Sequence, residues 1–203
     1  TNSQSRALED ALIREGLAYK IIGSVRFYER KEIKDALAYL RLLMNPDDDV
    51  SLRRVINVPA RGIGKGVMEA LEHINPEPPP SDAPLLADTE PETPPLSRSL
   101  WSRLDRAVGE KLVPTRALTA LGRFRTIIEN LNAVARDEQA SVTLAKALDQ
   151  SGYIQALREA GTEEAENRLG NLQELVSAAR DYELRETDAS VSGFVDRLSL
   201  LSE

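Results

Sequence analysis

The sequence predicts a mainly α-helical protein, a multi-helix bundle-like fold that contains a helix-hairpin-helix-like element. Apolar residues recur at three- and four-residue spacing over most of the chain, and proline or glycine marks the ends of these segments. Only residues 18–23 have the β-branched pattern of a strand. Because one strand needs partners, we expect it to complete a sheet in a missing part of a larger fold.

The composition permits a hydrophobic core and excludes several kinds of site. The chain has 203 residues, of which 41% are hydrophobic, enough for one domain or two small ones. It has no cysteine, which excludes disulfides and Cys-ligated zinc or iron–sulfur clusters. No apolar run is long enough to span a membrane and no signal-peptide pattern is present, so we expect a cytoplasmic piece of a longer protein.

The net charge of −7 is unevenly distributed. Residues 1–74 carry 12 basic and 11 acidic side chains, and residues 98–203 carry 14 and 17. Residues 75–97 between them carry five acids, no basic residue and eight of the eleven prolines. We therefore expect a Pro-rich, acidic and flexible insertion at 75–97, and little net charge in the N-terminal part.

Two helices are predicted on either side of the strand. The first spans residues 5–15 and stops at Gly16. The second ends before Pro46 and has four apolar residues on one face: Ile33, Leu37, Leu40 and Met44. Its charged start, residues 29–35, is either a solvated helix face or a surface that pairs with a neighbouring domain or DNA. The acids at 47–49 fit a helix N-cap better than a metal site.

The remainder of the chain predicts bundle helices with ordinary apolar faces. Ser97 or Ser99 caps one helix, Pro114 suits the first turn of a long one, and Ser141 opens a third that closes at Gly152. A short helix runs from Tyr153 to Ala160, and further helices start at Thr162 and near Ser190. The expected buried faces are Leu100, Trp101, Leu104 and Val108; Leu118, Leu121, Phe124, Ile128, Leu131 and Ala135; Leu144, Ala145 and Leu148; Leu169, Leu172, Val176 and Ala179; and Phe194, Val195, Leu198 and Leu201.

Residues 51–74 predict two short helices that flank the sequence Arg-Gly-Ile-Gly-Lys, which we call the 61–65 loop. The first helix carries Leu52, Val55 and Ile56 and cannot pass Pro59. The second begins near Lys65. The loop is therefore the turn of the helix-hairpin-helix-like element.

The 61–65 loop has the chemistry of a phosphate-binding turn. Gly62 and Gly64 lack a Cβ, so a phosphate can approach the main chain and accept hydrogen bonds from the N–H groups that open the second helix. Four basic residues and no acid lie between positions 53 and 65: Arg53, Arg54, Arg61 and Lys65. We expect contacts with nucleic-acid phosphates that do not read base sequence. The alternative is a tight helix connection with solvated arginines.

Other candidate chemistry is sparse. There is no GxxxxGK[ST] loop and no catalytic set of residues. We interpret His73, the single histidine, as a surface residue, and Trp101 as a core residue rather than a base-stacking one. One enzymatic alternative remains, because base-excision glycosylases place a catalytic Lys beside a helix-hairpin-helix, as Lys65 is placed here.

Several segments resemble the UvrD/PcrA-type superfamily 1 ATP-dependent DNA helicases, from the end of motif IV through the inserted 2B accessory subdomain. The resemblance rests on residues 1–12, on residues 19–64 with EIKD, NP-DD and RGIG in this order, and on SGYIQAL and NRLGNLQELVSAARDYE further on. It is weaker around 98–140. The resemblance implies that residues 1–25 belong to the second RecA-like motor domain and residues 26–203 to the 2B subdomain.

The resemblance also implies a function and a set of site residues. The parent protein would be a 3′–5′ helicase that uses ATP and Mg, whereas this chain alone lacks the ATP-binding motifs and needs no cofactor. Asn2 and Arg6 match motif IV, whose Asn approaches single-stranded DNA. Residues 61–64 match the GIG element that holds duplex DNA. The next position is more variable in the family, and in this chain it is Lys65. Arg54 completes the expected set of phosphate-binding residues. We expect no catalytic residue and no metal ligand.

The partners expected from the resemblance are duplex DNA, a single-strand/duplex junction, the remaining motor domains, and repair or transcription proteins. Because the subdomain is inserted through two chain crossings, we expect it to swivel as a rigid body. A rival interpretation from another class is a protein-interaction module, which docks a partner through the acidic 75–97 segment or the KEIKD face, residues 31–35.

Overall fold

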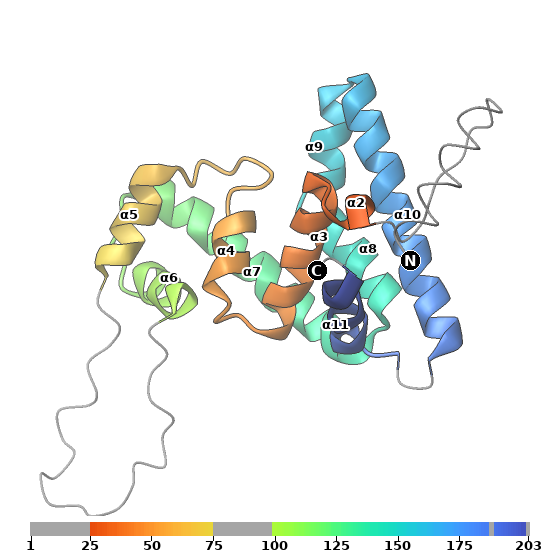
Figure 1. Ribbon diagram of the computed structural model, residues 1–203. Helices are drawn as coiled ribbons and strands as arrows, with labels where there is room; N and C mark the ends of the chain where they lie inside the picture. The colour runs from red at the N-terminus through yellow and green to blue at the C-terminus, as the bar shows by residue number, and fades with distance from the viewer. Residues whose placement is uncertain (1–24, 75–98, 187–188, 202–203) are drawn as a thin grey trace, which may run out of the picture.

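The computed structural model describes residues 25–74, 99–186 and 189–201, and every regular element in these ranges is a helix (Figure 1). This confirms the mainly α-helical prediction. The helices are α2 (Val25–Tyr28), α3 (Lys31–Met44), α4 (Asp49–Val55), α5 (Lys65–His73), α6 (Leu100–Gly109), α7 (Thr115–Asp137), α8 (Ala140–Gln150), α9 (Tyr153–Ala160), α10 (Glu163–Arg185) and α11 (Val191–Leu201). The helix expected at 5–15, the strand at 18–23 and the insertion at 75–97 lie outside the described residues.

Helix α3 is the centre of the bundle. It packs against α4, α7, α8, α10 and α11, and three of its fully buried side chains are Ile33, Tyr39 and Leu40. Figure 1 shows α5 and α6 together at one end of the molecule and α9 with α10 at the other, with α7 running between the two regions. The long α7 therefore connects the part around the 61–65 loop to the central bundle.

The predicted apolar faces are mostly buried, with two exceptions. Met44 is 45% exposed because it is the last residue of α3, where the helix leaves the core. Ala145, predicted to be buried, is exposed, whereas Ala147 is fully buried. The buried face of α8 follows Ala140, Leu144, Ala147 and Leu148, and position 145 is rotated about 100° away from that line.

The charged run at 29–35 is only partly a solvated face. Glu32 and Asp35 are only 4% and 2% exposed, whereas Lys31 and Lys34 face the solvent. The Asp35 carboxylate accepts a hydrogen bond from the Tyr153 hydroxyl at 2.8 Å and pairs with the Arg54 Nε at 2.8 Å. Buried carboxylates are retained when they are paired in this way. The expectation of a solvated face fails for these two acids, because the sequence pattern does not show that α9 and α10 cover them.

A polar network therefore joins α3 to α9 and α10. The Glu32 carboxylate accepts from the Asn171 amide, whose oxygen accepts from Arg30. Burial, with the nearby Asp35 carboxylate, raises the pKa of Tyr153, so its hydroxyl remains a donor.

The three acids at 47–49 have separate structural partners. The Asp48 side chain caps α4 by accepting from the N–H groups of Val50 and Ser51, which confirms the N-cap interpretation. Asp47 accepts from the Ser99 hydroxyl, and the Asp49 carboxylate accepts from the N–H of Leu100 at 2.7 Å. These two acids attach the start of α6 to the start of α4. Within the described ranges, no group of acidic or histidine side chains is arranged to hold a metal ion.

Other caps also follow the prediction. Ser99 and Thr162 accept from backbone N–H groups three residues later, and Gly161 ends α9 with φ of 58°. Among residues 25–74, 99–186 and 189–201, no helix has the length and apolar composition that crossing a bilayer requires.

We expect Asp35→Ala to lower the free energy of unfolding by about 3 kcal/mol, since it leaves the buried Tyr153 hydroxyl and the Arg54 guanidinium without their acceptor. Chemical denaturation followed by circular dichroism measures this change. Lys34→Ala is the matched control, because its exposed side chain should change stability by less than about 0.5 kcal/mol. Equal effects of the two substitutions would contradict the assigned role of the network.

Acid pH should remove the contribution of the Asp48 charge. Burial opposes this charge, but hydrogen bonds from Ser51 and from the Ser51 and Val50 N–H groups outweigh it and lower the Asp48 pKa from its ordinary 3.8. A lowered pKa stabilises the fold above pH 3.8, and the benefit is lost as the pH falls through the folded-state pKa. The stability difference between wild type and Asp48→Asn, measured by denaturation from pH 7 to pH 2, should therefore shrink on acidification. A difference independent of pH would contradict the assignment.

Candidate nucleic-acid interface

The chain between α4 and α5 is shaped by one asparagine. The Asn57 Oδ1 accepts from the N–H of Arg61 at 2.7 Å and from the N–H of Ile63 at 3.2 Å. The Val58–Pro59 peptide bond between them is cis. Sequence reasoning missed Asn57, although an asparagine two residues before a proline and five before a glycine is typical of turns.

The Arg61 side chain points into the protein. Its Nη2 donates to the Tyr39 hydroxyl and to the Ser151 carbonyl, both at 2.7 Å. Its Nη1 lies within 3.1–3.3 Å of three carbonyl oxygens at the end of α4 and beyond, those of Val55, Ile56 and Pro59. The guanidinium also lies over the Phe124 ring, 5.4 Å from its centroid. These contacts occupy the donor fork, so the geometry favours a structural contribution for Arg61 over direct phosphate binding.

Tyr39 completes the inner side of the loop. Its hydroxyl accepts from Arg61 and donates to the Val58 carbonyl. Burial raises the Tyr39 pKa, and the Arg61 charge opposes this shift only in part. The hydroxyl therefore stays protonated, and the loop is attached to α3 by a donor that does not titrate near neutral pH.

Alternate residues of the 61–65 loop face opposite directions. Ile63 is 2% exposed and packs in the core, whereas Gly62, Gly64 and Lys65 are exposed. Gly62 has φ of +81°, which requires glycine or a similar permissive residue. Gly64 is extended, with nothing within 4 Å of the position of a Cβ. No contact within the described structure therefore explains a glycine at 64.

Lys65 begins α5 and is the most accessible cation of the loop. Its side chain is 90% exposed, and its Nζ lies 3.5 Å from the Glu69 carboxylate one turn later. An exposed pair of this kind is weak and is readily replaced by another anion. No side chain caps the start of α5, and the N–H groups of Val67 and Met68 donate to the Gly64 carbonyl. The start of α5 therefore presents an exposed lysine beside main chain that carries no side-chain cap.

The structure does not bring every predicted site residue to this surface. Arg54 is 37% exposed, but its Nε pairs with Asp35 and its Nη2 lies 3.4 Å from the Lys31 carbonyl. Its neighbour Arg53 pairs with Glu72 of α5. Asn2 and Arg6 lie outside the described residues. His73 is exposed and Trp101 packs partly buried against the core, as predicted.

Two shallow grooves flank the loop and include residues that sequence reasoning missed. One, of about 490 Å³, is lined by Gly62, Gly64, Gly66, Val67, Ala70, Val113, Pro114, Arg116 and Ala117. The other, of about 590 Å³, is lined by Ala60, Arg61, Arg116, Thr119, Ala120, Arg123 and Ile127. Arg116 and Arg123 belong to α7, for which only a buried apolar face was predicted. The sequence did contain a sign of a basic surface, because residues 115–128 include three arginines and no acid.

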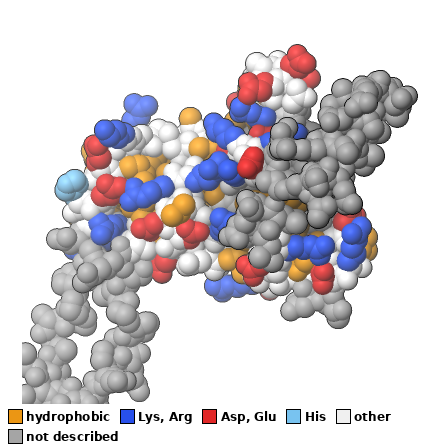
Figure 2. Space-filling model, in the orientation of Figure 1, with side chains coloured by type: hydrophobic (Ala, Val, Ile, Leu, Met, Phe, Trp, Pro, Cys, Tyr) orange, Lys and Arg blue, Asp and Glu red, His pale blue; other side chains and the backbone are white. Residues whose placement is uncertain are grey.

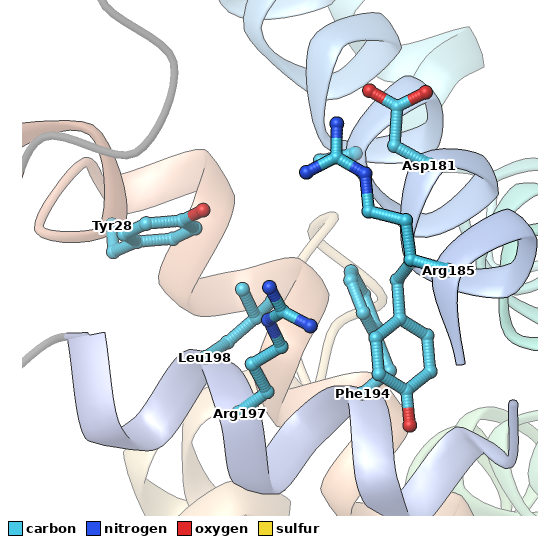
Figure 3. A pocket seen from close by; sticks show the side chains of 8 residues that line it. Tyr28, Asp181, Arg185, Phe194, Arg197 and Leu198 are labelled. Atoms are coloured by element: carbon cyan, nitrogen blue, oxygen red, sulfur yellow. The ribbon is translucent and has the colours of Figure 1, made fainter. Parts of the chain in front are cut away.

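A third pocket, of about 390 Å³, lies elsewhere, between α2, α10 and α11 (Figure 3). Figure 3 shows Arg185 beside Asp181 and Arg197 next to Leu198, with Tyr28 on the facing wall. Arg197 pairs with Glu186 at 2.7 Å, so acids compensate its charge. Beside this pocket, a Cβ at Gly193 would lie 2.3 Å from the Tyr182 hydroxyl, so a larger residue there would displace the tyrosine side chain. This pocket has mixed charge and is separate from the 61–65 loop.

We expect Arg61→Ala to lower the free energy of unfolding by about 3 kcal/mol or more, because it leaves the Ser151 and Pro59 carbonyls and the Tyr39 hydroxyl without their donor. Thermal and chemical denaturation measure the effect. Arg180→Ala, on the exposed face of α10, is the matched control and should be nearly neutral. If Arg61→Ala were as stable as this control, the inward role of Arg61 would have to be abandoned.

The sequence of this chain is similar to one protein family and to several DNA helicases. Residues 1–77 match the family described as the UvrD-like helicase C-terminal domain. The chain is 34% identical over 203 residues to the ATP-dependent DNA helicase PcrA of Bacillus subtilis, covering all of this chain and 25% of that protein. It is 35% identical over 188 residues to DNA helicase II of Escherichia coli, covering 93% of this chain and 24% of that protein.

A third relative is the ATP-dependent DNA helicase UvrD1 of Mycobacterium tuberculosis, 37% identical over 221 residues, which cover all of this chain and 26% of the relative. The chain thus spans about a quarter of the length of the curated relatives it matches. Together, the family match and these relatives support the interpretation that this chain is a region of a UvrD/PcrA-type helicase.

Proposed function

We propose that this chain is the duplex-binding accessory subdomain of an ATP-dependent 3′–5′ DNA helicase, and that the 61–65 loop binds duplex phosphates. The observation that carries the proposal is the exposed surface of Gly62, Gly64 and Lys65 at the uncapped start of α5. Phosphates bind well at such helix starts, because main-chain N–H groups and a lysine act on the same anion. Contacts of this kind hold a duplex without reading its sequence.

Within this proposal the loop residues have two different roles. Gly62, Gly64 and Lys65 contact the phosphates, while Arg61 and Ile63 hold the loop in place from inside. Arg54 acts through its pair with Asp35, which positions α4. Asn2 and Arg6 would approach single-stranded DNA, as motif IV implies. The original expectation of a direct Arg61 contact is thereby replaced with a positioning role.

The proposed whole protein uses ATP and Mg outside this chain, since the sequence has no GxxxxGK[ST] loop. Residues 1–25 would belong to the second motor domain and residues 26–203 to the 2B subdomain. The subdomain then acts as a handle: it holds the duplex while the motor domains pull one strand, and it swivels between inhibited and active arrangements.

Neither rival function has support from the described residues, and the acidic 75–97 segment through which a protein partner could dock lies outside them. In the KEIKD face, Glu32 and Asp35 are buried, so only the two lysines remain for a protein partner. A glycosylase needs a base pocket with aromatic side chains, and neither groove beside Lys65 is lined by one.

Gly64→Ala tests the proposal with little effect on the fold. The backbone at 64 (φ −86°, ψ −173°) suits alanine, and open space surrounds the added methyl group. Stability should change by less than about 1 kcal/mol, because the N-cap preference and the backbone entropy act in opposite directions. Affinity for a duplex with a 3′ tail, measured by fluorescence anisotropy, should fall several-fold because the methyl group blocks phosphate approach.

Gly170→Ala is the control, since it adds the same methyl group in open space on α10. Lys65→Gln should also weaken binding and reduce the dependence of log K on log salt by about 0.9, the value for one phosphate contact. If Gly64→Ala and Lys65→Gln bound like Gly170→Ala, the loop would be only a helix connection.

A further inference from the structure

The exposed face of α7 carries two arginines that no described residue neutralises. Arg116 and Arg123 are exposed, and neither has an ion pair or hydrogen bond with any part of the chain that the structure describes. Their basic neighbours differ in this respect. Arg106 pairs with Glu110, and Arg125 pairs with Asp105 and Glu129. Exposed arginines without a partner among the described residues also occur elsewhere, as at Arg180 of α10, so Arg116 and Arg123 are distinguished by their position beside the 61–65 loop.

The two arginines lie beside the 61–65 loop. Arg116 lines both grooves, and so it shares one groove with Gly62 and Gly64 and the other with Arg61. Arg123 continues the second groove two turns further along α7. The stacking of Arg61 on Phe124 fixes the loop against the same helix. The loop and the α7 arginines thus form one continuous surface.

Among the described residues, neither groove is lined by an Asp or Glu side chain. The acid beside the loop is Glu69, which pairs with Lys65 across 3.5 Å. The first acid of α7 is Glu129, beyond both arginines. On the visible face of Figure 2 basic and acidic side chains alternate, so an acid-free groove is a local feature and not a property of the whole surface. Thr119 and Ala120, between the arginines, are small and leave the groove open.

The spacing suits a nucleic-acid backbone. Positions seven apart on a helix lie on one face, about 10 Å from each other. Phosphates of one DNA strand advance about 3.4 Å along the axis per base pair and also wind around it. Two long arginine side chains that start about 10 Å apart on one helix face can therefore each reach a separate phosphate.

We propose that Arg116 and Arg123 form a second row of phosphate contacts, so that a duplex lies along the exposed face of α7 as well as on the 61–65 loop. This inference rests on the proposed function and extends it to a defined path. The ligand is the sugar-phosphate backbone of a duplex of any sequence. Charge is sufficient for these contacts, because arginines that bind phosphates read no bases.

The test compares the full 203-residue chain with Arg116→Gln/Arg123→Gln on a duplex of random sequence, by anisotropy across about 50 to 200 mM salt. The slope of log K against log salt should become shallower by about 1.8 in the double variant. The affinity advantage of the wild type should therefore fall about tenfold across this salt range. Arg180→Gln on α10 is the control for loss of an exposed arginine and should leave the slope unchanged.

Two further variants separate the possible results. Arg116→Lys/Arg123→Lys keeps the charges and should restore the wild-type slope, whereas failure of this rescue would overturn a pure phosphate role. If Lys65→Gln reduces the slope and the α7 double variant does not, the α7 path is wrong while the loop function stands. If neither variant changes the slope, or if the wild type does not bind at low salt, both proposals fail for this chain.

Discussion

The Arg61 guanidinium is the interaction on which the loop and its surroundings depend. It joins the Tyr39 hydroxyl of α3, the carbonyls at the end of α4 and the Ser151 carbonyl after α8, and it stacks on Phe124 of α7. One side chain therefore contacts four elements, of which α3, α7 and the end of α8 are distant from it in sequence. Arginine suits this position because its planar donors reach several acceptors at once while its face stacks on a ring.

The same interaction explains how the loop presents its outer groups. Residues that hold the loop alternate with residues that face solvent: Arg61 and Ile63 lie inside, and Gly62, Gly64 and Lys65 lie outside. Asn57 adds two hydrogen bonds to the loop main chain. A surface held in this way needs little reordering when an anion binds, which lowers the entropic cost of binding.

Five acidic residues, two of α3 and three at 47–49, are bonded within the fold and therefore do not oppose this surface. Glu32 and Asp35 accept hydrogen bonds in a buried network. Asp47, Asp48 and Asp49 accept hydrogen bonds at the starts of α4 and α6. Around the loop, the exposed charges include Lys65 with its partner Glu69, and Arg116 and Arg123 of α7. Local potential, more than net charge, determines where a phosphate binds, so a chain of −7 is compatible with a nucleic-acid interface.

The sequence by itself determined the helical class, the helix ends and the position of the 61–65 loop. These depend on local chemistry: apolar periodicity, caps such as Asp48 and Thr162, and breakers such as Gly161 act within a few residues. Only the tertiary structure decided which charges are buried and which are free. Arg61 turns inward because Tyr39 and Ser151 meet it there, and Arg116 and Arg123 remain free because no acid packs against that face of α7 in the described residues. Such choices depend on contacts between segments far apart in sequence, which no local pattern encodes.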